Sequence, residues 1–252
     1  MYTRLLSALS SLSVFLILIS TLAISFPLAA ATPESSEAIS PLAAHYRETT
    51  QSSGKIRSTR DWYLLRRTDR IATAGEDRAE IWQRDARGDI RLVRVFHGDR
   101  KLIEYTGGEL RTQQRYPDWT RLGSVFDPRR IPAMKPVGKQ NYLGRPATRY
   151  RQRHDGVITE VIWLNQESLA ASIMRRRGGV TTTLALKELR DSPAPAWPVA
   201  RLDGSIQIDG IEDYARIDGA DLGDMESDPF VKRIMGDAEE HGGHAHSHAA
   251  HR

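Results

Sequence analysis

The clearest pattern of hydrophobic and polar positions lies in the second half of the chain. Three segments rich in apolar and β-branched residues follow one another there: Val157–Leu164, Ser168–Arg176 and Val180–Leu189. Asp155-Gly156 precedes the first segment and Gly178-Gly179 separates the last two, and both dipeptides tolerate the positive φ that tight hairpin turns require. The pattern predicts three antiparallel strands joined by tight turns.

The first half of the chain repeats this rhythm of short segments and turn residues. Arg87-Gly88, Gly98-Asp99 and Gly107-Gly108 mark turns that recur about every ten residues, which is typical of an antiparallel sandwich, barrel or curved sheet. The predicted strands, including one beyond the middle of the chain, are Asp61–Arg70, Ala79–Arg84, Asp89–Phe96, Lys101–Tyr105, Glu109–Arg115 and Ala147–His154. The predicted fold class is mainly β (α+β), a curved antiparallel sheet or half-open barrel with a few short helices.

One face of the predicted sheet is apolar, and arginines occupy much of the other. In the strand Ala147–His154 every second residue is an arginine: Arg149, Arg151 and Arg153. Such a row either binds an anion or an acidic partner, or keeps an exposed sheet face soluble.

Two short helices are predicted beside these strands. Ser40 as N-cap and proline at the first helical position favour a helix over Pro41–Thr50. One face of this helix would carry Leu42, Tyr46 and Thr49. Asp228 is the predicted N-cap of a second helix, Phe230–Met235.

A proline-rich segment, Tyr116–Tyr142, interrupts the strand pattern and contains Trp119 and Phe126. A connection of this length inside a compact domain usually has a function or covers part of the domain. It is predicted to be a loop with one helical turn around Trp119–Val125. It serves either as a lid over a cavity or as a crossover between two halves of the sheet.

The N-terminal segment Met1–Ala31 has the features of a secretory signal. Arg4 is its only charge, and the apolar run Leu12–Ala30 ends in small residues. Cleavage is expected near Ala31, which predicts a periplasmic protein. The alternative is an uncleaved membrane anchor, since a run of about 18 apolar residues is long enough to span a membrane.

The C-terminal segment, Glu239–Arg252, carries the clearest chemical signal. Five of the eight histidines lie in it: His241, His244, His246, His248 and His251. Neutral imidazole binds Cu(II), Ni(II) and Zn(II), and a flexible tract can gather several imidazoles around one ion. The segment is predicted to be a disordered tail that binds a divalent transition metal. The alternative is a polar tail without a metal role.

Composition limits the chemistry available to the rest of the chain. The 252 residues include no cysteine, which excludes disulfides, thiolate catalysis and thiolate metal sites. The net charge is +4, and the arginines are spread along strands rather than clustered, so a nucleic-acid site is not expected. The histidines His45, His97 and His154 are far apart. No nucleophile elbow, P-loop or Rossmann pattern occurs, which predicts that the protein is not an enzyme.

These observations divide the chain into five segments. We expect a signal peptide at residues 1–31, a polar linker with an N-terminal helix at 32–54, and the half-barrel domain at 55–220. A short helical region at 221–238 and the tail at 239–252 follow. Ser205–Ile211 and Tyr214–Ile217 are strand-like, and the sequence leaves open whether they join the main sheet.

The order of these elements is similar to that of the periplasmic outer-membrane lipoprotein carrier (LolA-like) superfamily. A Gly-Arg-Pro-Ala turn at 144–147, a strand ending in Val161-Ile162-Trp163-Leu164-Asn165 and the threonine-rich strand Val180–Leu189 carry the resemblance. It covers about residues 43–198, and the residues after Pro198 depart from the carrier pattern. The resemblance implies a half-open barrel that binds acyl chains or protein partners and has no catalytic centre. The carriers latch their groove with an arginine, but arginines are too abundant here for one to be assigned.

Two functions are compatible with the sequence. The first is a non-enzymatic exported binding protein that holds an acyl chain, a lipid or another apolar ligand on the concave face, with a lipoprotein as a further candidate partner and no required cofactor. The second is an envelope interaction or sensory module that uses the sheet to dock an acidic protein or anionic lipid headgroups. The candidate ligand-binding residues are Leu64, Trp82, Val93, Val95, Ile103, Tyr105, Tyr150, Val161, Trp163, Ile173 and Leu184.

Overall fold

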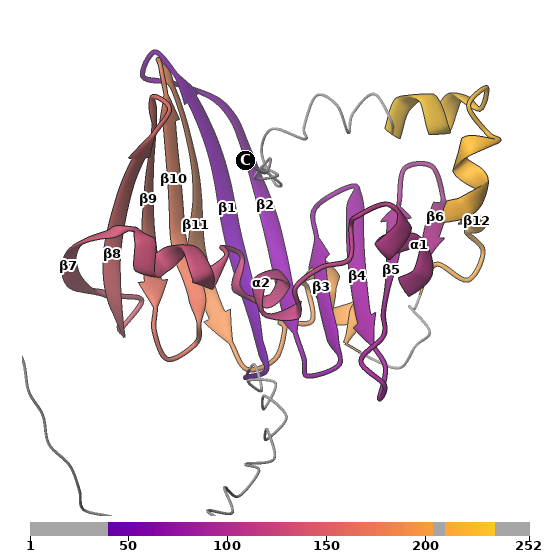
Figure 1. Ribbon diagram of the computed structural model, residues 1–252, viewed down its shortest axis with the longest axis horizontal. Coiled ribbons are helices and arrows are strands. Elements are labelled where there is room, and N and C mark those ends of the chain that lie inside the picture. Colours follow the sequence, from indigo (N-terminus) through magenta and orange to yellow (C-terminus); the bar gives the residue numbers. More distant parts are fainter. Residues whose placement is uncertain (1–39, 204–209, 235–252) are drawn as a thin grey trace, which may run out of the picture. The chain divides into compact units, whose positions relative to one another are not determined.

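Twelve strands form one open sheet in the part of the chain that the computed structural model describes, residues 40–203 and 210–234 (Figure 1). The first six are β1 (Leu42–Ser52), β2 (Lys55–Arg66), β3 (Arg70–Ala74), β4 (Arg78–Arg84), β5 (Ile90–Phe96) and β6 (Lys101–Tyr105). The others are β7 (Lys135–Tyr142), β8 (Arg145–His154), β9 (Val157–Leu164), β10 (Leu169–Arg177), β11 (Val180–Arg190) and β12 (Ala215–Asp218). The predicted fold class is confirmed. The predicted signal peptide and histidine-rich tail lie outside the described residues.

The order of strands across the sheet is β12-β6-β5-β4-β3-β2-β1-β11-β10-β9-β8-β7. Strands β1 and β11 pair antiparallel in the middle, although they are far apart in the sequence. Two meanders, β1 to β6 and β7 to β11, therefore lie side by side. Strand β12 pairs parallel with β6 at one edge, and β7 forms the other edge.

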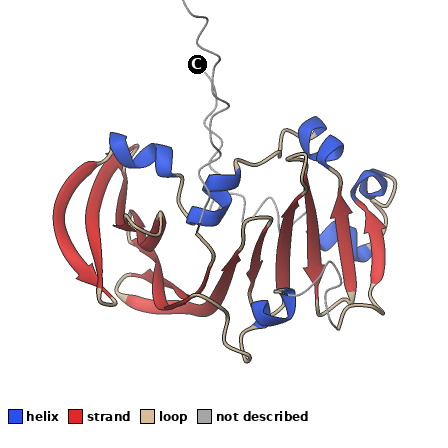
Figure 2. Ribbon diagram, turned by 90° about the horizontal axis from the view of Figure 1, so that it is seen from below, coloured by secondary structure: helices blue, strands red, loops and turns tan. Residues whose placement is uncertain are grey.

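Short helices lie on both faces of this sheet (Figure 2). They are α1 (Gly107–Thr112), α2 (Trp119–Ser124), η1 (Pro128–Ala133), η2 (Pro198–Leu202) and η3 (Gly219–Gly223), followed by a helical turn over residues 229–234. Asp228 caps this last turn, because its carboxylate accepts a hydrogen bond of 2.7 Å from the backbone N–H of Phe230, as predicted. Over residues 40–203 and 210–234, no helix is long and apolar enough to span a membrane.

The hydrophobic core occupies both faces of the central strands, because successive residues of a strand point to opposite sides. Leu64 belongs to the cluster that contains Leu110 of α1, whereas its neighbour Leu65 belongs to the cluster that contains Val199 of η2. All four side chains are fully buried. Both faces of β2 are therefore covered near its C-terminal end.

The other half of the sheet, from β7 to β11, curls toward the side that carries α2 and η1 (Figure 2). We call that side the inner face and the opposite side the outer face. Phe126, Ile131 and Met134 cover part of the inner face and form a third, separate cluster with strand residues of β9 and β10. The α2–η1 segment thus covers the curled part of the sheet.

The predicted hairpin turns occur where expected. Asp155 and Gly156 join β8 to β9 with φ of 47° and 72°, and Gly178 begins the β10–β11 turn with φ of 57°. Ser53 and Gly54 make an equivalent turn between β1 and β2, with φ of 51° and 76°. These left-handed conformations match the twist of two-residue hairpins.

The predicted helix over Pro41–Thr50 is wrong, because this segment is the strand β1. It pairs with β2 on one side and with β11 on the other. Ala43 and Ala44 are both fully buried although they point to opposite faces. Burial on two faces and two pairing partners override the local helical pattern.

The predicted strand Glu109–Arg115 is also wrong, because helix α1 begins at Gly107. Thr106 and Glu109 form a capping box, in which the Thr106 hydroxyl accepts the Glu109 N–H at 3.3 Å and the Glu109 carboxylate accepts the Thr106 N–H at 2.6 Å. A Cβ at Gly107 would lie 3.0 Å from the Ile90 carbonyl oxygen, so the glycine allows close packing on β5.

Besides β1, two further strands, β3 and β7, were not predicted. The segment predicted as one strand, Asp61–Arg70, contains the end of β2 and a turn into β3, closed by a 2.7 Å hydrogen bond from the Arg67 N–H to the Arg70 carbonyl. Strand β7 lies in the segment predicted as a loop. Pro136 is tolerated there because β7 is an edge strand with a bulge after this residue.

The strand-like segment Tyr214–Ile217 joins the sheet as β12, parallel to β6. Most of the other strand-like segment, Ser205–Ile211, lies outside the described residues. The C-terminal part of the domain therefore extends the sheet at the edge far from β7.

Candidate ligand-binding face

The eleven predicted ligand-binding residues do not line one groove. Leu64, Trp82, Ile103 and Tyr105 are buried in the main core, and Leu184 packs against it. Val95 is buried in the core beneath η2, and Val93 packs against that cluster on the outer side of the meander. The residues in the third cluster or against it are Val161, Trp163, Tyr150 and Ile173.

Four of these residues form a continuous row across the inner face. The strand register places Tyr150 of β8 opposite Val161 of β9, Val161 opposite Ile173 of β10, and Ile173 opposite Leu184 of β11. Val161 is fully buried, whereas the other three side chains are partly exposed. We call Tyr150, Val161, Ile173 and Leu184 the apolar row.

The row continues into charged residues on the first meander. Leu184 is opposite Glu48 of β1, and Glu48 is opposite Arg60 of β2. Arg60 and Glu48 form an ion pair at 2.9 Å. The apolar row therefore ends against a neutralised pair and not against an isolated charge.

The α2–η1 segment covers Val161, the buried residue of the row. Phe126, Ile131 and Met134 pack with Val161 and Trp163. Its helices are held by side-chain caps, in which Asp118 accepts the Arg121 N–H and Asp127 accepts the Arg129 N–H, each at 3.0 Å. Each helix has only six residues, so the cover depends on this small cluster for its position.

An arginine lies beside the apolar row on the inner face. Arg175 is two residues after Ile173 and is opposite Thr159 and Thr182. Burial lowers the pKa of Arg175, and the Arg130 guanidinium of η1 lowers it further by repulsion. Two cations thus approach the same part of the inner face, which favours an anion there.

The sequence could not single out one arginine, but the structure distinguishes Arg66. Its side chain is fully buried, and its guanidinium donates to the carbonyls of Ser40 at 2.8 Å, Gly123 at 2.9 Å and Glu167 at 2.7 Å. Burial lowers its pKa to about 10. Arg66 thus joins the start of β1, the end of α2 and the β9–β10 turn. No local pattern around it in the sequence marks this role.

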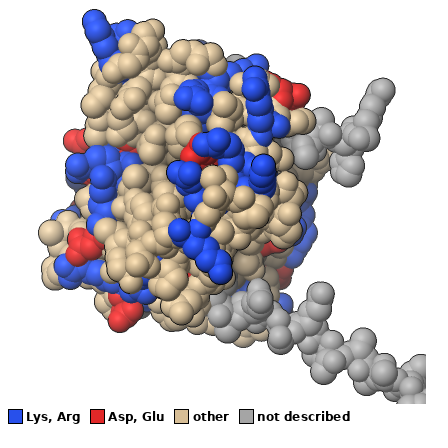
Figure 3. All heavy atoms as spheres, turned by 90° about the vertical axis from the view of Figure 1, so that its left-hand side faces the viewer, with Lys and Arg blue, Asp and Glu red and all other residues tan. Residues whose placement is uncertain are grey.

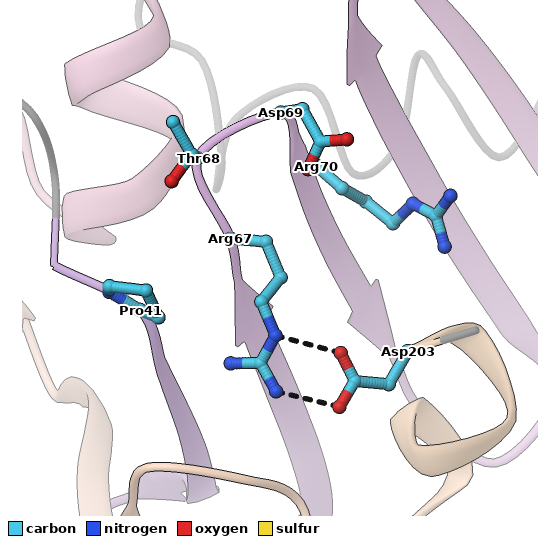
Figure 4. Close-up of a pocket in the computed structure, with 6 residues that line it drawn as sticks. All are labelled: Pro41, Arg67, Thr68, Asp69, Arg70 and Asp203. Carbon is cyan, nitrogen blue, oxygen red and sulfur yellow. Dashed lines mark hydrogen bonds and ion pairs between the residues drawn. The ribbon is translucent and has the colours of Figure 1, made fainter. Parts of the chain in front are cut away.

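Two open cavities within the described ranges lie away from the apolar row, and most of the residues that line them are polar. One, of about 300 Å³, is lined by Pro41, Arg67, Thr68, Asp69, Arg70 and Asp203 (Figure 4). Arg67 donates two hydrogen bonds to the Asp203 carboxylate, at 2.7 and 2.6 Å, so the charges of these two residues are paired with each other. Another, of about 410 Å³, lies between β7 and β8 and reaches Asn165.

The predicted metal ligands His241, His244, His246, His248 and His251 lie outside the described residues. Among the residues that are described, no three side chains of the histidine, cysteine, aspartate or glutamate type gather around a point. His45 lies 3.1 Å from Asp61 and stacks on Tyr63, and His97 lies 3.2 Å from the Tyr214 hydroxyl. The three histidines outside the tail therefore sit in separate environments.

Comparison with known proteins found solved structures that are similar to this chain, but no similar sequences. No protein-family model and no curated protein matches the sequence. PNGF-II matches with a TM-score of 0.41 and 10% identity over 75% of this chain, which spans only 34% of that protein. MucB in the Pseudomonas aeruginosa MucA/MucB complex matches with a TM-score of 0.34 and 18% identity, over 62% of this chain and 53% of that chain. A LolA superfamily protein from Nitrosomonas europaea matches with a TM-score of 0.27 and 8% identity, over 62% of this chain and 88% of that chain.

Proposed function

We propose that this protein is a non-enzymatic, exported binding protein that holds an acyl chain on the inner face of the sheet. The observation that carries the proposal is the apolar row, in which Tyr150, Ile173 and Leu184 remain partly exposed beside a buried Val161. An extended hydrocarbon chain lying across these strands would remove the exposed apolar surface from water, which stabilises the complex.

The α2–η1 segment supports the proposal because it covers the same row. Its three apolar side chains, Phe126, Ile131 and Met134, form a cluster separate from the main core. Such a small cluster costs less to open than the main core does, and an acyl chain offers Val161 and Trp163 an equivalent apolar contact. The segment acts as a cover that the ligand displaces in part.

The direct test is native mass spectrometry of the protein purified from its own host, combined with titration of a fluorescent fatty acid. A co-purifying lipid or saturable fatty-acid binding is expected. Absence of both would contradict the proposal.

Two adjacent residues of β10 provide a matched pair of variants. Ile173 is on the inner face, whereas Met174 is on the outer face opposite Glu160 and Thr183, and both are half-buried. Ile173→Asp should weaken fatty-acid binding at least about tenfold, because it places a carboxylate in the apolar row. Met174→Asp should leave the affinity within about twofold. Equal losses in the two variants, at equal thermal stability, would exclude the inner face as the site.

A second candidate function, docking of an acidic protein partner, is favoured by the outer face. Arg149 and Arg153 of β8 lie there beside Arg151, which pairs with Glu160 at 2.6 Å. Basic surfaces strengthen association electrostatically, and salt weakens that association. A pull-down from envelope extract whose yield is the same at low and high salt would contradict this function.

A further inference from the structure

Three hairpin turns lie side by side at one end of the sheet. They are Ser53-Gly54 between β1 and β2, Gly178-Gly179 between β10 and β11, and Asp155-Gly156 between β8 and β9 (Figure 1). The first two are joined by a 3.0 Å hydrogen bond from the Ser53 N–H to the Gly179 carbonyl. The ends of six strands therefore form one continuous protruding surface.

Apolar side chains are unusually exposed at this end. Ile56 is 64% exposed and Val180 is 43% exposed. Ile56 is opposite Gln51 and Val180 is opposite Ser52, so the two residues lie on the strands at either side of the end of β1, with their side chains on opposite faces of the sheet. Within the described residues, only Val137 and Leu143 are other large hydrophobic side chains of comparable exposure.

Cations surround these two side chains. Lys55, Arg57, Arg153, Arg176 and Arg177 are all exposed, and none of them has an ion-pair partner among the residues described. The acidic residue of the three turns, Asp155, lies 3.1 Å from His154. Figure 3, which faces the β7 side of the sheet, shows Lys and Arg side chains spread over that side with few acidic groups among them. We call Lys55, Ile56, Arg57, Arg153, Arg176, Arg177 and Val180 the tip surface.

Other arginines of the same strands have carboxylate partners. Arg47 pairs with Asp61 at 2.9 Å and Arg60 pairs with Glu48 at 2.9 Å. These two arginines lie toward the middle of β1 and β2, whereas the five cations of the tip surface lie at the strand ends, where the apolar side chains are exposed. An anionic partner could therefore neutralise these cations without breaking any ion pair that they already form.

We propose that the tip surface docks on a membrane with anionic lipid headgroups. Guanidinium groups bind phosphate in a bidentate manner, and arginine and lysine keep their charge among headgroups while their stems contact apolar surface. Ile56 and Val180 enter the boundary between headgroups and acyl chains, as the apolar side chains of interfacial proteins do. A protruding end suits a flat bilayer, whereas a peptide requires a groove or an edge strand.

The test is co-sedimentation of the full chain with vesicles of phosphatidylcholine alone or mixed with phosphatidylglycerol. Binding is expected only with the anionic lipid and should weaken as salt increases. A triple variant, Arg57→Gln with Arg176→Gln and Arg177→Gln, should bind about a hundredfold more weakly, because each cation near an anionic surface contributes about fivefold.

The matched control removes the same charge elsewhere. Arg87, Lys187 and Arg201 are exposed residues away from the hairpin tips, and their replacement by glutamine should leave binding nearly unchanged. A double variant, Ile56→Ser with Val180→Ser, keeps the charge and should weaken binding about tenfold through lost apolar contact. Since all of these side chains are exposed, the variants should keep the circular dichroism spectrum of the native protein.

Three results would overturn the proposal. Equal binding to neutral vesicles would remove the role of the cations, and equal losses in the tip and control triple variants would show a general charge effect. Capture of polyglutamate without capture of anionic vesicles would assign the tip surface to an acidic polypeptide. Fatty-acid affinity should not change in the tip variants, so failure of membrane docking is distinguishable from failure of acyl-chain binding.

Discussion

Arg66 is the single side chain that connects most of the segments around the inner face. Its three hydrogen bonds reach carbonyls of the N-terminal segment, α2 and the β9–β10 turn. Among the described residues no carboxylate forms an ion pair with it, so its buried charge depends mainly on these carbonyl oxygens, with a longer-range attraction from Glu167. Losing the guanidinium would leave three carbonyls without this donor.

Arg66→Met should lower the free energy of unfolding by about 3 kcal/mol or more, since each buried acceptor left unsatisfied costs about 1 kcal/mol or more. Urea denaturation measures this change. Arg60→Met, which removes an exposed ion pair, is the control and should cost at most about 1 kcal/mol. If the two variants lose the same stability, the buried hydrogen bonds of Arg66 are not important to the fold.

Tyr46 contributes a second buried polar contact, a 2.7 Å hydrogen bond from its hydroxyl to the Ala170 carbonyl. Burial raises the pKa of Tyr46 in the folded protein. Above about pH 10 the tyrosine ionises only in the unfolded state, which stabilises that state, so this contribution to stability is lost as pH rises. The stability advantage of the native protein over Tyr46→Phe should therefore shrink between about pH 9 and pH 11. A constant difference would contradict the assigned pKa shift.

We propose that Arg175 gives the inner face a preference for an anionic headgroup of the ligand. It lies beside Ile173, and burial, together with repulsion from Arg130, lowers its pKa. Arg175→Gln should weaken the binding of a fatty acid several-fold while leaving the binding of the corresponding fatty alcohol unchanged. Isothermal titration of the two ligands makes the comparison, and equal losses for both would remove Arg175 from headgroup recognition.

At the scale of elements, hairpins with glycine in their turns were predictable from sequence and the other elements were less so. The turns at Asp155-Gly156 and Gly178-Gly179 identified β8 to β11, because glycine and aspartate mark positive φ directly. The β2–β3 turn contains no glycine or proline, so the predicted strand Asp61–Arg70 ran through this turn and β3 was not identified. Helix α1 carried a recognisable capping box at Thr106 and Glu109, but the two glycines between them suggested a turn.

Strand β1 shows why local spacing alone is insufficient. Leu42 and Tyr46 are four residues apart, a spacing that fits one face of a helix and equally one face of a strand. Pairing with β2 and β11 decided the outcome, and such long-range pairing is not visible in one segment. The same limit applies to the candidate site. The residues predicted from sequence came from all three clusters, because the sequence does not show which strands lie next to one another.

The identity of β1 can be tested with Ala44→Asp. In a helix with Leu42, Tyr46 and Thr49 on its buried face, residue 44 would face water and accept aspartate. In the strand, Ala44 is fully buried, so the variant should lose about 3 kcal/mol or more of stability or fail to fold. The measurement is thermal unfolding. If Ala44→Asp unfolded at the same temperature as the native protein, the strand assignment would be contradicted.

At the scale of the whole molecule, we propose three functions for separate regions: acyl-chain binding on the inner face, membrane docking at the tip surface and metal binding on the histidine-rich tail. The tail lies outside the described residues, so its role rests on composition alone.

Deleting residues 239–252 should abolish binding of Cu(II) and leave the thermal unfolding of the domain almost unchanged. Cu(II) should bind the full chain more tightly than Ni(II) or Zn(II). Affinity should fall as the pH drops through about 6.5, because protonated imidazole cannot bind a metal. Calorimetry of the full and shortened chains measures this, and equal copper affinity would place the metal site elsewhere.

The central claim, that the inner face holds an acyl chain, is tested most directly by photolabelling. A fatty acid with a photoreactive group at mid-chain is bound, illuminated and located by peptide mass spectrometry. The label should attach to Tyr150, Ile173 or Leu184 on the inner face, and an excess of unlabelled fatty acid should prevent it. Labelling of outer-face residues such as Arg149 or Met174 instead, or labelling that excess fatty acid does not reduce, would contradict the proposed function.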